Sequence, residues 1–156
     1  MRIERPAINV HLVPWDDPEA TGLRDGQRRE IAERYGTPDS EPGTPPSAGD
    51  MAVFAVVRDA DGVAVGCGGL RDLGDGFGEV KRMYVRPESR GSGAAAALLH
   101  TLEEWARGRD WKCLRLETGD RQPDAVRFYT RSGYTPIPAF GAYADEPSSL
   151  CFERVL

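Results

Sequence analysis

The chain has 156 residues, and its 20 basic and 25 acidic side chains give a formal net charge of −5 at pH 7. This length predicts a single domain over residues 1–156, and 40% hydrophobic with 29% charged residues is typical of a folded globular protein. The acidic balance argues against broad nucleic-acid binding through phosphate contacts. No apolar run approaches the roughly 20 residues that cross a bilayer, and the first residues do not resemble a secretory signal. We therefore expect a cytoplasmic protein that binds neither nucleic acid nor membrane.

The N-terminal third predicts a strand, a helix and a long loop. Apolar residues alternate from Ile8 to Leu12 as in a strand, and residues 24–35 have the pattern of a helix. Between residues 38 and 50 the chain carries four prolines, two glycines and no basic side chain. Regular structure does not persist in such a composition, so we expect residues 36–50 to form a flexible loop.

Three consecutive antiparallel strands are predicted next. Residues 51–58 and 63–70 are rich in β-branched and aromatic side chains, and the turn sequence Asp-Ala-Asp-Gly joins them. A polar, glycine-rich segment at residues 72–78 predicts a second turn, which leads into a third strand at residues 79–85.

The second half of the chain alternates between helix and strand patterns. In residues 93–107, Leu98, Leu102 and Trp105 fall at positions i, i+4 and i+7 of a helix, and Gly108 is placed to end it. The remaining predicted elements are a strand at residues 111–117, a short helix from Pro123 to Gly133, and strands at residues 134–137 and 149–155.

Motifs for metal binding and for nucleophilic hydrolysis are missing. Cys67, Cys113 and Cys151 are far apart and have no Cys-x-x-Cys or Cys/His metal-ligand spacing. Ser92 lacks the Gly-x-Ser-x-Gly frame of a hydrolase nucleophile, and the chain has only two histidines. We expect three buried, reduced thiols and no metal site.

A run of very small residues points to an anion-binding turn. Residues 90–95, Arg-Gly-Ser-Gly-Ala-Ala, join the third predicted strand to the following helix. Glycines allow close approach of a ligand to the backbone, and the first N–H groups of a helix have no partners within the helix. Arg86 and Arg90 add positive charge beside this turn. A phosphate or a diphosphate would suit such a site, although a plain tight turn is the alternative.

The same run formally matches a dinucleotide-binding fingerprint. Gly91-x-Gly93-x-x-Ala96 has the glycine spacing, and Glu117 ends a later strand where an acid could bind a ribose. The five residues at 86–90 separate the strand from its first glycine, and antiparallel strands precede it instead of parallel ones. This spacing counts against a dinucleotide-binding fold.

The segment around the small-residue run resembles the acetyl-CoA motif of the GNAT (Gcn5-related) N-acetyltransferases. Residues 79–87 read Glu-Val-Lys-Arg-Met-Tyr-Val-Arg-Pro, and the family pattern Arg/Gln-x-x-Gly-x-Gly/Ala follows, filled by Arg90, Gly93 and Ala95. Residues 125–134, Ala-Val-Arg-Phe-Tyr-Thr-Arg-Ser-Gly-Tyr, are similar to a second motif of this family. The resemblance extends over residues 51–155.

The resemblance implies both a fold and an acyl donor. The implied fold is a mixed α/β sheet of six to seven mostly antiparallel strands, flanked by helices and splayed open beside residues 79–85. The donor is acetyl-CoA, with its pantetheine arm along backbone groups of Met83 and Val85 and its diphosphate at the small-residue turn. The implied cofactor-binding residues are Met83, Tyr84, Val85, Arg90, Gly91, Ser92, Gly93, Ala94, Ala95 and Gln122.

The resemblance also implies catalytic roles for two side chains. Tyr129 occupies the position of the phenol that protonates the departing CoA sulfur, and Glu79 resembles a glutamate that deprotonates the amine, directly or through water. Gln122 stands where the family usually has Asn. The implied acceptor is a primary amine of a small molecule or peptide. The sequence leaves open whether the protein forms a homodimer. A CoA-binding regulatory module without turnover is the alternative function.

Overall fold

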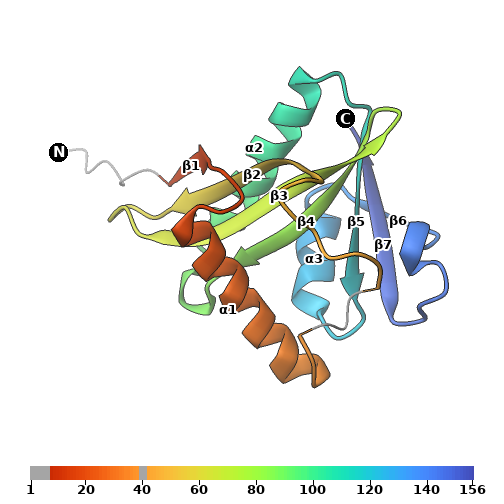
Figure 1. Cartoon of the computed structure of the whole chain (residues 1–156), viewed down its shortest axis with the longest axis horizontal. Helices are drawn as coiled ribbons and strands as arrows, with labels where there is room; N and C mark the ends of the chain where they lie inside the picture. The colour runs from red at the N-terminus through yellow and green to blue at the C-terminus, as the bar shows by residue number, and fades with distance from the viewer. Residues whose placement is uncertain (1–7, 39–41) are drawn as a thin grey trace.

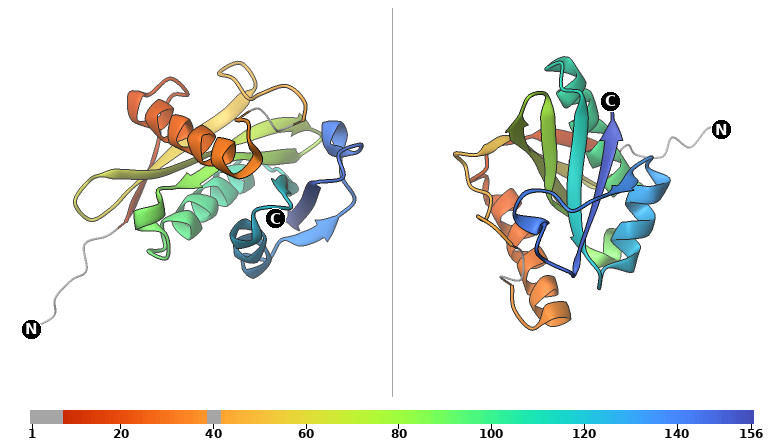
Figure 2. Two further views of the ribbon diagram at one scale, coloured as in Figure 1. Left: turned by 90° about the horizontal axis from the view of Figure 1, so that it is seen from below. Right: turned by 90° about the vertical axis from the view of Figure 1, so that its right-hand side faces the viewer.

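A computed structural model describes residues 8–38 and 42–156 of the chain. It contains one seven-stranded sheet in the order β1-β2-β3-β4-β5-β7-β6. Helix α1 lies on one face of the sheet, and α2 and α3 lie on the other (Figures 1 and 2). All neighbouring strands are antiparallel except β4 and β5. The expected mixed, mostly antiparallel sheet flanked by helices is therefore confirmed.

The elements follow the predicted order along the chain. They are β1 (Asn9–Leu12), α1 (Pro18–Tyr35), β2 (Met51–Arg58), β3 (Ala64–Gly74), β4 (Phe77–Val85), the 3-10 turn η1 (Pro87–Ser89), α2 (Ala94–Gly108), β5 (Cys113–Gly119), α3 (Pro123–Arg131), β6 (Thr135–Ile137), the 3-10 turn η2 (Gly141–Tyr143) and β7 (Ser149–Val155). No helix among the described residues is long and apolar enough to cross a membrane.

Helix α1 begins six residues earlier than predicted. The Asp17 carboxylate accepts a hydrogen bond from the Ala20 N–H at 3.0 Å, and Pro18 occupies the first turn, where its missing N–H costs nothing. Gly22 weakens the helical pattern in the sequence just before residue 24, where the predicted helix starts. The helix ends at Gly36, whose positive φ of 79° closes it.

The predicted glycine-rich turn at residues 72–78 is mostly strand. Strands β3 and β4 continue through it, and only Asp75 and Gly76 form the turn. Their φ values of 57° and 85° are both positive, as a two-residue type I′ hairpin requires. Gly78 then lies so close to Trp111 that a Cβ would fall 2.4 Å from its ring. The glycines here allow tight packing instead of a long loop.

Strands β4 and β5 form a fork. Their parallel pairing runs only from Phe77 opposite Cys113 to Glu79 opposite Arg115, and it stops there within the described chain. Beyond this point β4 carries a bulge, with Arg82 and Met83 opposite Gly68 alone and Arg82 at a positive φ of 59°. The two strands then diverge (Figure 1), so the expected splayed centre of the sheet is confirmed.

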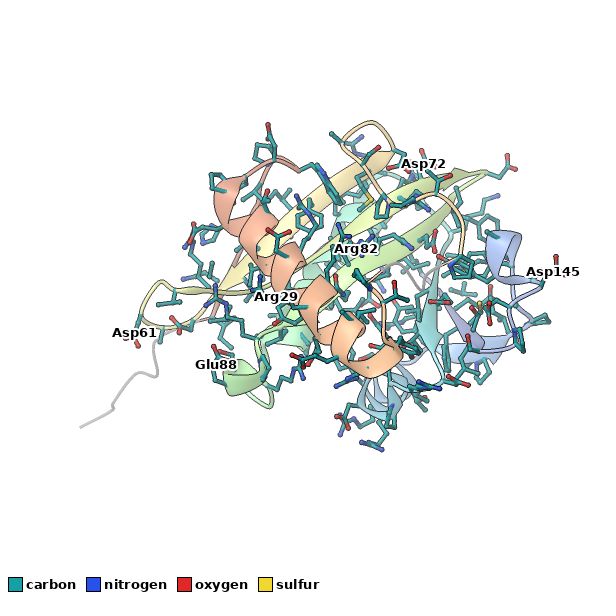
Figure 3. All side chains as sticks on the ribbon, turned by 60° about the horizontal axis from the view of Figure 1, so that its bottom comes forward. Arg29, Asp61, Asp72, Arg82, Glu88 and Asp145 are labelled. Atoms are coloured by element: carbon teal, nitrogen blue, oxygen red, sulfur yellow. The ribbon has the colours of Figure 1, made fainter. Side chains whose placement is uncertain are left out.

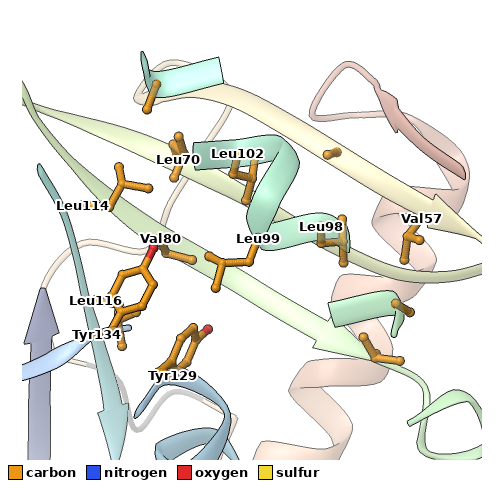
Figure 4. Packing of buried hydrophobic residues seen from close by; sticks show 14 of the residues in the cluster. Val57, Leu70, Val80, Leu98, Leu99, Leu102, Leu114, Leu116, Tyr129 and Tyr134 are labelled. Atoms are coloured by element: carbon orange, nitrogen blue, oxygen red, sulfur yellow. The ribbon is translucent and has the colours of Figure 1, made fainter. Parts of the chain in front are cut away.

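Two hydrophobic clusters fix the helices on their faces of the sheet. The larger one joins α2 to the sheet and includes Leu98, Leu102, Leu114 and Leu116 (Figure 4). The smaller one lies under α1 and includes Leu23, with Phe54 and Val56 of β2. Leu98 and Leu102 are the helical positions that the sequence pattern assigned to the core.

The three cysteines are free and buried, as expected. Burial raises the pKa of Cys67 to about 12, so this thiol is not a nucleophile at neutral pH.

Candidate active site

The small-residue turn lies where β4 ends and α2 begins. Gly91 and Gly93 have φ values of 78° and 91°, which other residues rarely adopt. Gly93 is the N-cap of α2, and no acidic side chain lies in the first turn of this helix. The Ala94 N–H has a long contact of 3.4 Å to Ser92 Oγ. The first N–H groups and the positive end of the helix dipole can therefore attract an anion with no competing carboxylate in the first turn of the helix.

Backbone conformation, more than free space, requires glycine in this turn. A Cβ at Gly91 would meet no atom within 4 Å, and one at Gly93 would meet only the side chain of Ile8, at 3.8 Å. The backbone conformation of Gly93 is therefore one reason for a glycine at this position. Its positive φ strains any other residue.

A groove of about 490 Å³ runs from this turn along β4. It is bordered by α1 on one side and α3 on the other. The structure brings nine of the ten predicted cofactor-binding residues together in its wall, and Ser92 is the exception. The nine residues are Met83, Tyr84, Val85, Arg90, Gly91, Gly93, Ala94, Ala95 and Gln122. Ser92 instead braces the turn, since its hydroxyl donates to the Ser89 carbonyl at 2.5 Å.

The free edge of β4 forms the floor of the groove. The Arg86 N–H donates to Val65 of β3, so the alternation of an antiparallel strand directs the polar backbone groups of Met83 and Val85 away from β3. Two side chains already bind this edge. Gln27 Nε2 donates to the Met83 carbonyl and Arg90 Nε to the Val85 carbonyl, each at 2.9 Å.

These two contacts give Gln27 and Arg90 roles that the sequence did not reveal. Arg90 also pairs with Glu30 of α1 at 2.8 Å, so it ties the turn to α1 as well as adding charge. Gln27 Oε1 is buried and has no hydrogen-bond partner in the described chain. An orphaned acceptor beside a strand edge that no neighbouring strand covers fits an amide-bearing, extended ligand such as pantetheine.

A second, smaller pocket of about 150 Å³ opens at the fork. Its charged wall residues are Lys81 and Arg82 of β4 and Glu117 of β5. Arg82 lies beside α1 near the centre of the face that this helix covers (Figure 3). The two pockets share part of their walls, and the shared residues are Gln27, Ile31, Met83, Gln122, Ala125 and Tyr129. A ligand in the groove and a ligand in the small pocket would therefore meet beside Met83 and Tyr129.

Tyr129 lies at this meeting point. It belongs to α3 and is 7% exposed, with its ring against Phe128 and Tyr134 (Figure 4). Burial raises the pKa of its phenol, so the hydroxyl keeps its proton at neutral pH. Gln122, the N-cap residue of α3, makes no capping hydrogen bond with its side chain, and it lines both pockets.

Glu79 lies behind the small pocket in a buried polar network. It is 2% exposed and is not among the described residues that line either pocket. Its Oε2 accepts a 2.6 Å hydrogen bond from the Tyr143 hydroxyl, whose oxygen accepts a 3.0 Å bond from Lys81 Nζ. Burial raises the pKa of Glu79, while Tyr143 and Arg71 oppose this shift.

The sequence places the loop that holds Phe140 and Tyr143 beside the acceptor pocket, but it predicts no role for Lys81 and no contact between Lys81 and Tyr143. Lys81 follows Glu79 by two residues, so both side chains lie on one face of β4. This two-residue spacing is visible in the sequence. Tyr143 comes from the loop before β7, more than sixty residues away, as the 62-residue separation of its bond to Lys81 shows. No local pattern could place it there.

The chain matches the model of the Acetyltransferase (GNAT) family over residues 16–134. It is 39% identical over 104 residues to an IAA acetyltransferase of Azospirillum brasilense, which covers 66% of this chain and 67% of the relative. It is 30% identical over 93 residues to the uncharacterized N-acetyltransferase YsnE of Bacillus subtilis, covering 58% of this chain and 62% of that one. The alignment thus spans less than two thirds of YsnE's length.

Solved structures agree over nearly the whole chain. A proposed acyl-CoA N-acyltransferase of Klebsiella pneumoniae has a TM-score of 0.81 and 34% identity, covering 97% of this chain and 99% of its own. The PaiA N-acetyltransferase of Thermoplasma acidophilum, solved with coenzyme A, shares the fold with a TM-score of 0.71 at 16% identity, covering 96% and 99%. With the forked sheet and the glycine turn at its mouth, these matches establish that the chain belongs to the GNAT family of acetyltransferases.

Proposed function

We propose that this protein transfers the acetyl group of acetyl-CoA directly to a primary amine of a small molecule or peptide. The observation that carries this proposal is the fork between β4 and β5, where two pockets share a wall that includes Met83 and Tyr129. Direct transfer needs both substrates held in contact at one point. Two pockets with a shared wall supply this arrangement without a covalent intermediate on the enzyme.

The groove is the proposed site of acetyl-CoA. Its diphosphate would lie at the helix start of residues 91–95, where N–H groups and the helix dipole attract an anion. The pantetheine arm would run along the free edge of β4 and hydrogen-bond to backbone groups of Met83 and Val85. The orphaned Gln27 Oε1 supports this path, because it would gain an N–H donor from a pantetheine amide.

Tyr129 is the proposed general acid. Its phenol lies at the meeting point of the pockets, and its raised pKa keeps the proton available. The neutral phenol can donate a hydrogen bond to the developing thiolate, although it is a weaker acid than a thiol near pKa 8.5. Tyr129 would donate its proton to the CoA sulfur as the amide forms.

The small pocket is the proposed acceptor site. A volume of about 150 Å³ admits a compact amine or the end of a longer one. Burial raises the pKa of Glu117 in its wall, and in the ionised form this carboxylate attracts an ammonium group. An acetyl-CoA-consuming reaction also fits the expected cytoplasmic location.

Two measurements test this function. Calorimetry measures acetyl-CoA binding, and a thiol-reactive dye measures CoA release with a panel of small amines and amino-terminal peptides. The proposal expects both binding and amine-dependent thiol release. Binding without release by any amine would favour the CoA-binding module, and no binding at all would contradict both readings.

A further inference from the structure

Lys81 occupies a distinct place at the fork. The last register pair between the two strands is Glu79 opposite Arg115. Two residues further along each strand, on the same face, come Lys81 and Glu117, and both line the acceptor pocket. Of the two cationic groups of β4 that line this pocket, Lys81 and Arg82, Lys81 is therefore the one nearer the closed end of the fork.

The surroundings of Lys81 favour its neutral form over the ammonium form. The side chain is 6% exposed, and burial, helped by the nearby charge of Arg82, lowers the pKa of Lys81 to about 8. Glu117 on β5 opposes this shift. Of the groups packed on its other side, Tyr143 accepts its hydrogen bond at 3.0 Å and Glu79 lies 3.7 Å from Nζ.

Contacts on one side fix where Nζ points. Tyr143 bonds to Lys81 and Glu79 at once, so the three side chains form one chain of hydrogen bonds. The carboxylate of Glu79 can stabilise an added positive charge on Nζ, although it does not itself reach the pocket wall. Such an arrangement suits a base that gains and loses a proton near neutral pH.

We propose that Lys81 Nζ takes the proton of the acceptor's ammonium group, with Glu79 and Tyr143 as positioning residues. This inference rests on the proposed acetyltransferase function. The amine arrives as an ammonium ion, and its first proton passes to the lone pair of neutral Lys81 and then to solvent. The freed amine forms the C–N bond as the C–S bond breaks. The second proton leaves the nitrogen for solvent, and Tyr129, after giving its proton to the sulfur, regains one from solvent, so that no net proton is gained or lost in this step.

The pH dependence of kcat tests this role. With saturating amine, the wild-type kcat should rise with pH along a limb centred near pH 8, where Lys81 becomes neutral. Lys81→Met should lower kcat by about 10² to 10⁴, the usual contribution of a general base, and remove the limb. Lys81→Arg should be as impaired as Lys81→Met, because a guanidinium keeps the charge but does not give up its proton.

Glu79→Gln separates the two candidate bases. Removing a carboxylate 3.7 Å from Nζ should lower the pKa of Lys81, so the limb should move to lower pH with a kcat loss below about tenfold. Lys112→Met is the matched control, because Lys112 is the other lysine of the chain and is exposed. It should leave kcat and the limb unchanged.

Four results would overturn the inference. They are an unchanged kcat and limb in Lys81→Met, full activity in Lys81→Arg, loss of the limb in Glu79→Gln, and loss of the limb in Glu117→Gln while Lys81→Met keeps it. Acetyl-CoA binding by calorimetry is measured for each variant, so that a misfolded protein is recognised. Absence of thiol release from the wild-type protein would instead contradict the proposed function, so this outcome is distinguished from failure of the Lys81 inference.

Discussion

At the scale of single residues, the site combines one phenol and one amine whose environments shift their pKa values in opposite directions. Burial raises the pKa of Tyr129 and lowers that of Lys81 to about 8. The phenol is therefore protonated at neutral pH and the amine is partly neutral, and these are the starting states of the acid and the base that we propose. Both effects come chiefly from exclusion of water at the fork.

Tyr129→Phe tests the acid role. The substitution keeps the ring packing against Phe128 and Tyr134 and removes only the hydroxyl. We expect kcat to fall by about 10²-fold or more, with the acetyl-CoA dissociation constant changed less than threefold. Steady-state kinetics and calorimetry measure these quantities, and an undiminished kcat would eliminate Tyr129 as the acid.

The buried contact between α2 and the last strands gives a prediction on stability. Glu103 accepts hydrogen bonds from the Tyr134 hydroxyl at 2.9 Å and from Arg154 at 2.8 Å. Tyr134→Phe leaves Glu103 with one donor fewer, so the free energy of unfolding should fall by about 1–3 kcal/mol. Urea denaturation measures it. Tyr35→Phe, in which the removed hydroxyl accepts an exposed hydrogen bond, is the control and should cost less than half as much.

At the scale of elements, the glycine turn couples backbone conformation to binding. Gly93→Val forces a β-branched residue into a φ of 91°, which should cost about 1–2 kcal/mol in stability. A shift of the turn would also misdirect the first N–H groups of α2. We expect the KM for acetyl-CoA to rise at least tenfold, while the KM for the amine changes little.

Gly62→Val is the matched control for this prediction. Gly62 has a φ of 78° and open space around a Cβ, but it lies in the β2–β3 turn. It should show a similar loss of stability with an unchanged KM for acetyl-CoA. If both variants raise the KM for acetyl-CoA equally, backbone strain alone explains the effect, and contact between the Gly93 turn and the donor does not.

Local patterns predicted the elements well, and long-range contacts limited the rest. The periodicity of Leu98 and Leu102 identified α2, and the motif around Gly93 located the groove. The predicted turn at residues 72–78 is longer than the observed two-residue turn at Asp75 and Gly76. The whole stretch is polar and glycine-rich, and the Asp-Gly pair within it is the part that favours a two-residue turn. The Gln27 contact with β4 spans 56 residues, so no local pattern contains it.

At the scale of the whole molecule, the two faces of the sheet contribute different parts of the site, which meet at the fork between β4 and β5. The α2 and α3 side supplies the main core, together with the helix start and the phenol. The α1 side and the loop before β7 supply Gln27 and the polar network of Glu79 and Tyr143. The pairing of β4 with β5 ends at Glu79, before the bulge at Arg82, and the pockets open beyond this point. Architecture, more than any single residue, thus sets where donor and acceptor meet.

A crystal structure with acetyl-CoA and a non-reacting acceptor analogue tests the central claim most directly. The account predicts the diphosphate at residues 91–95, the pantetheine arm beside Met83 and Val85, and the thioester sulfur within hydrogen-bond distance of the Tyr129 hydroxyl. Acetyl-CoA bound elsewhere on the chain, or a thioester remote from the gap between β4 and β5, would contradict it.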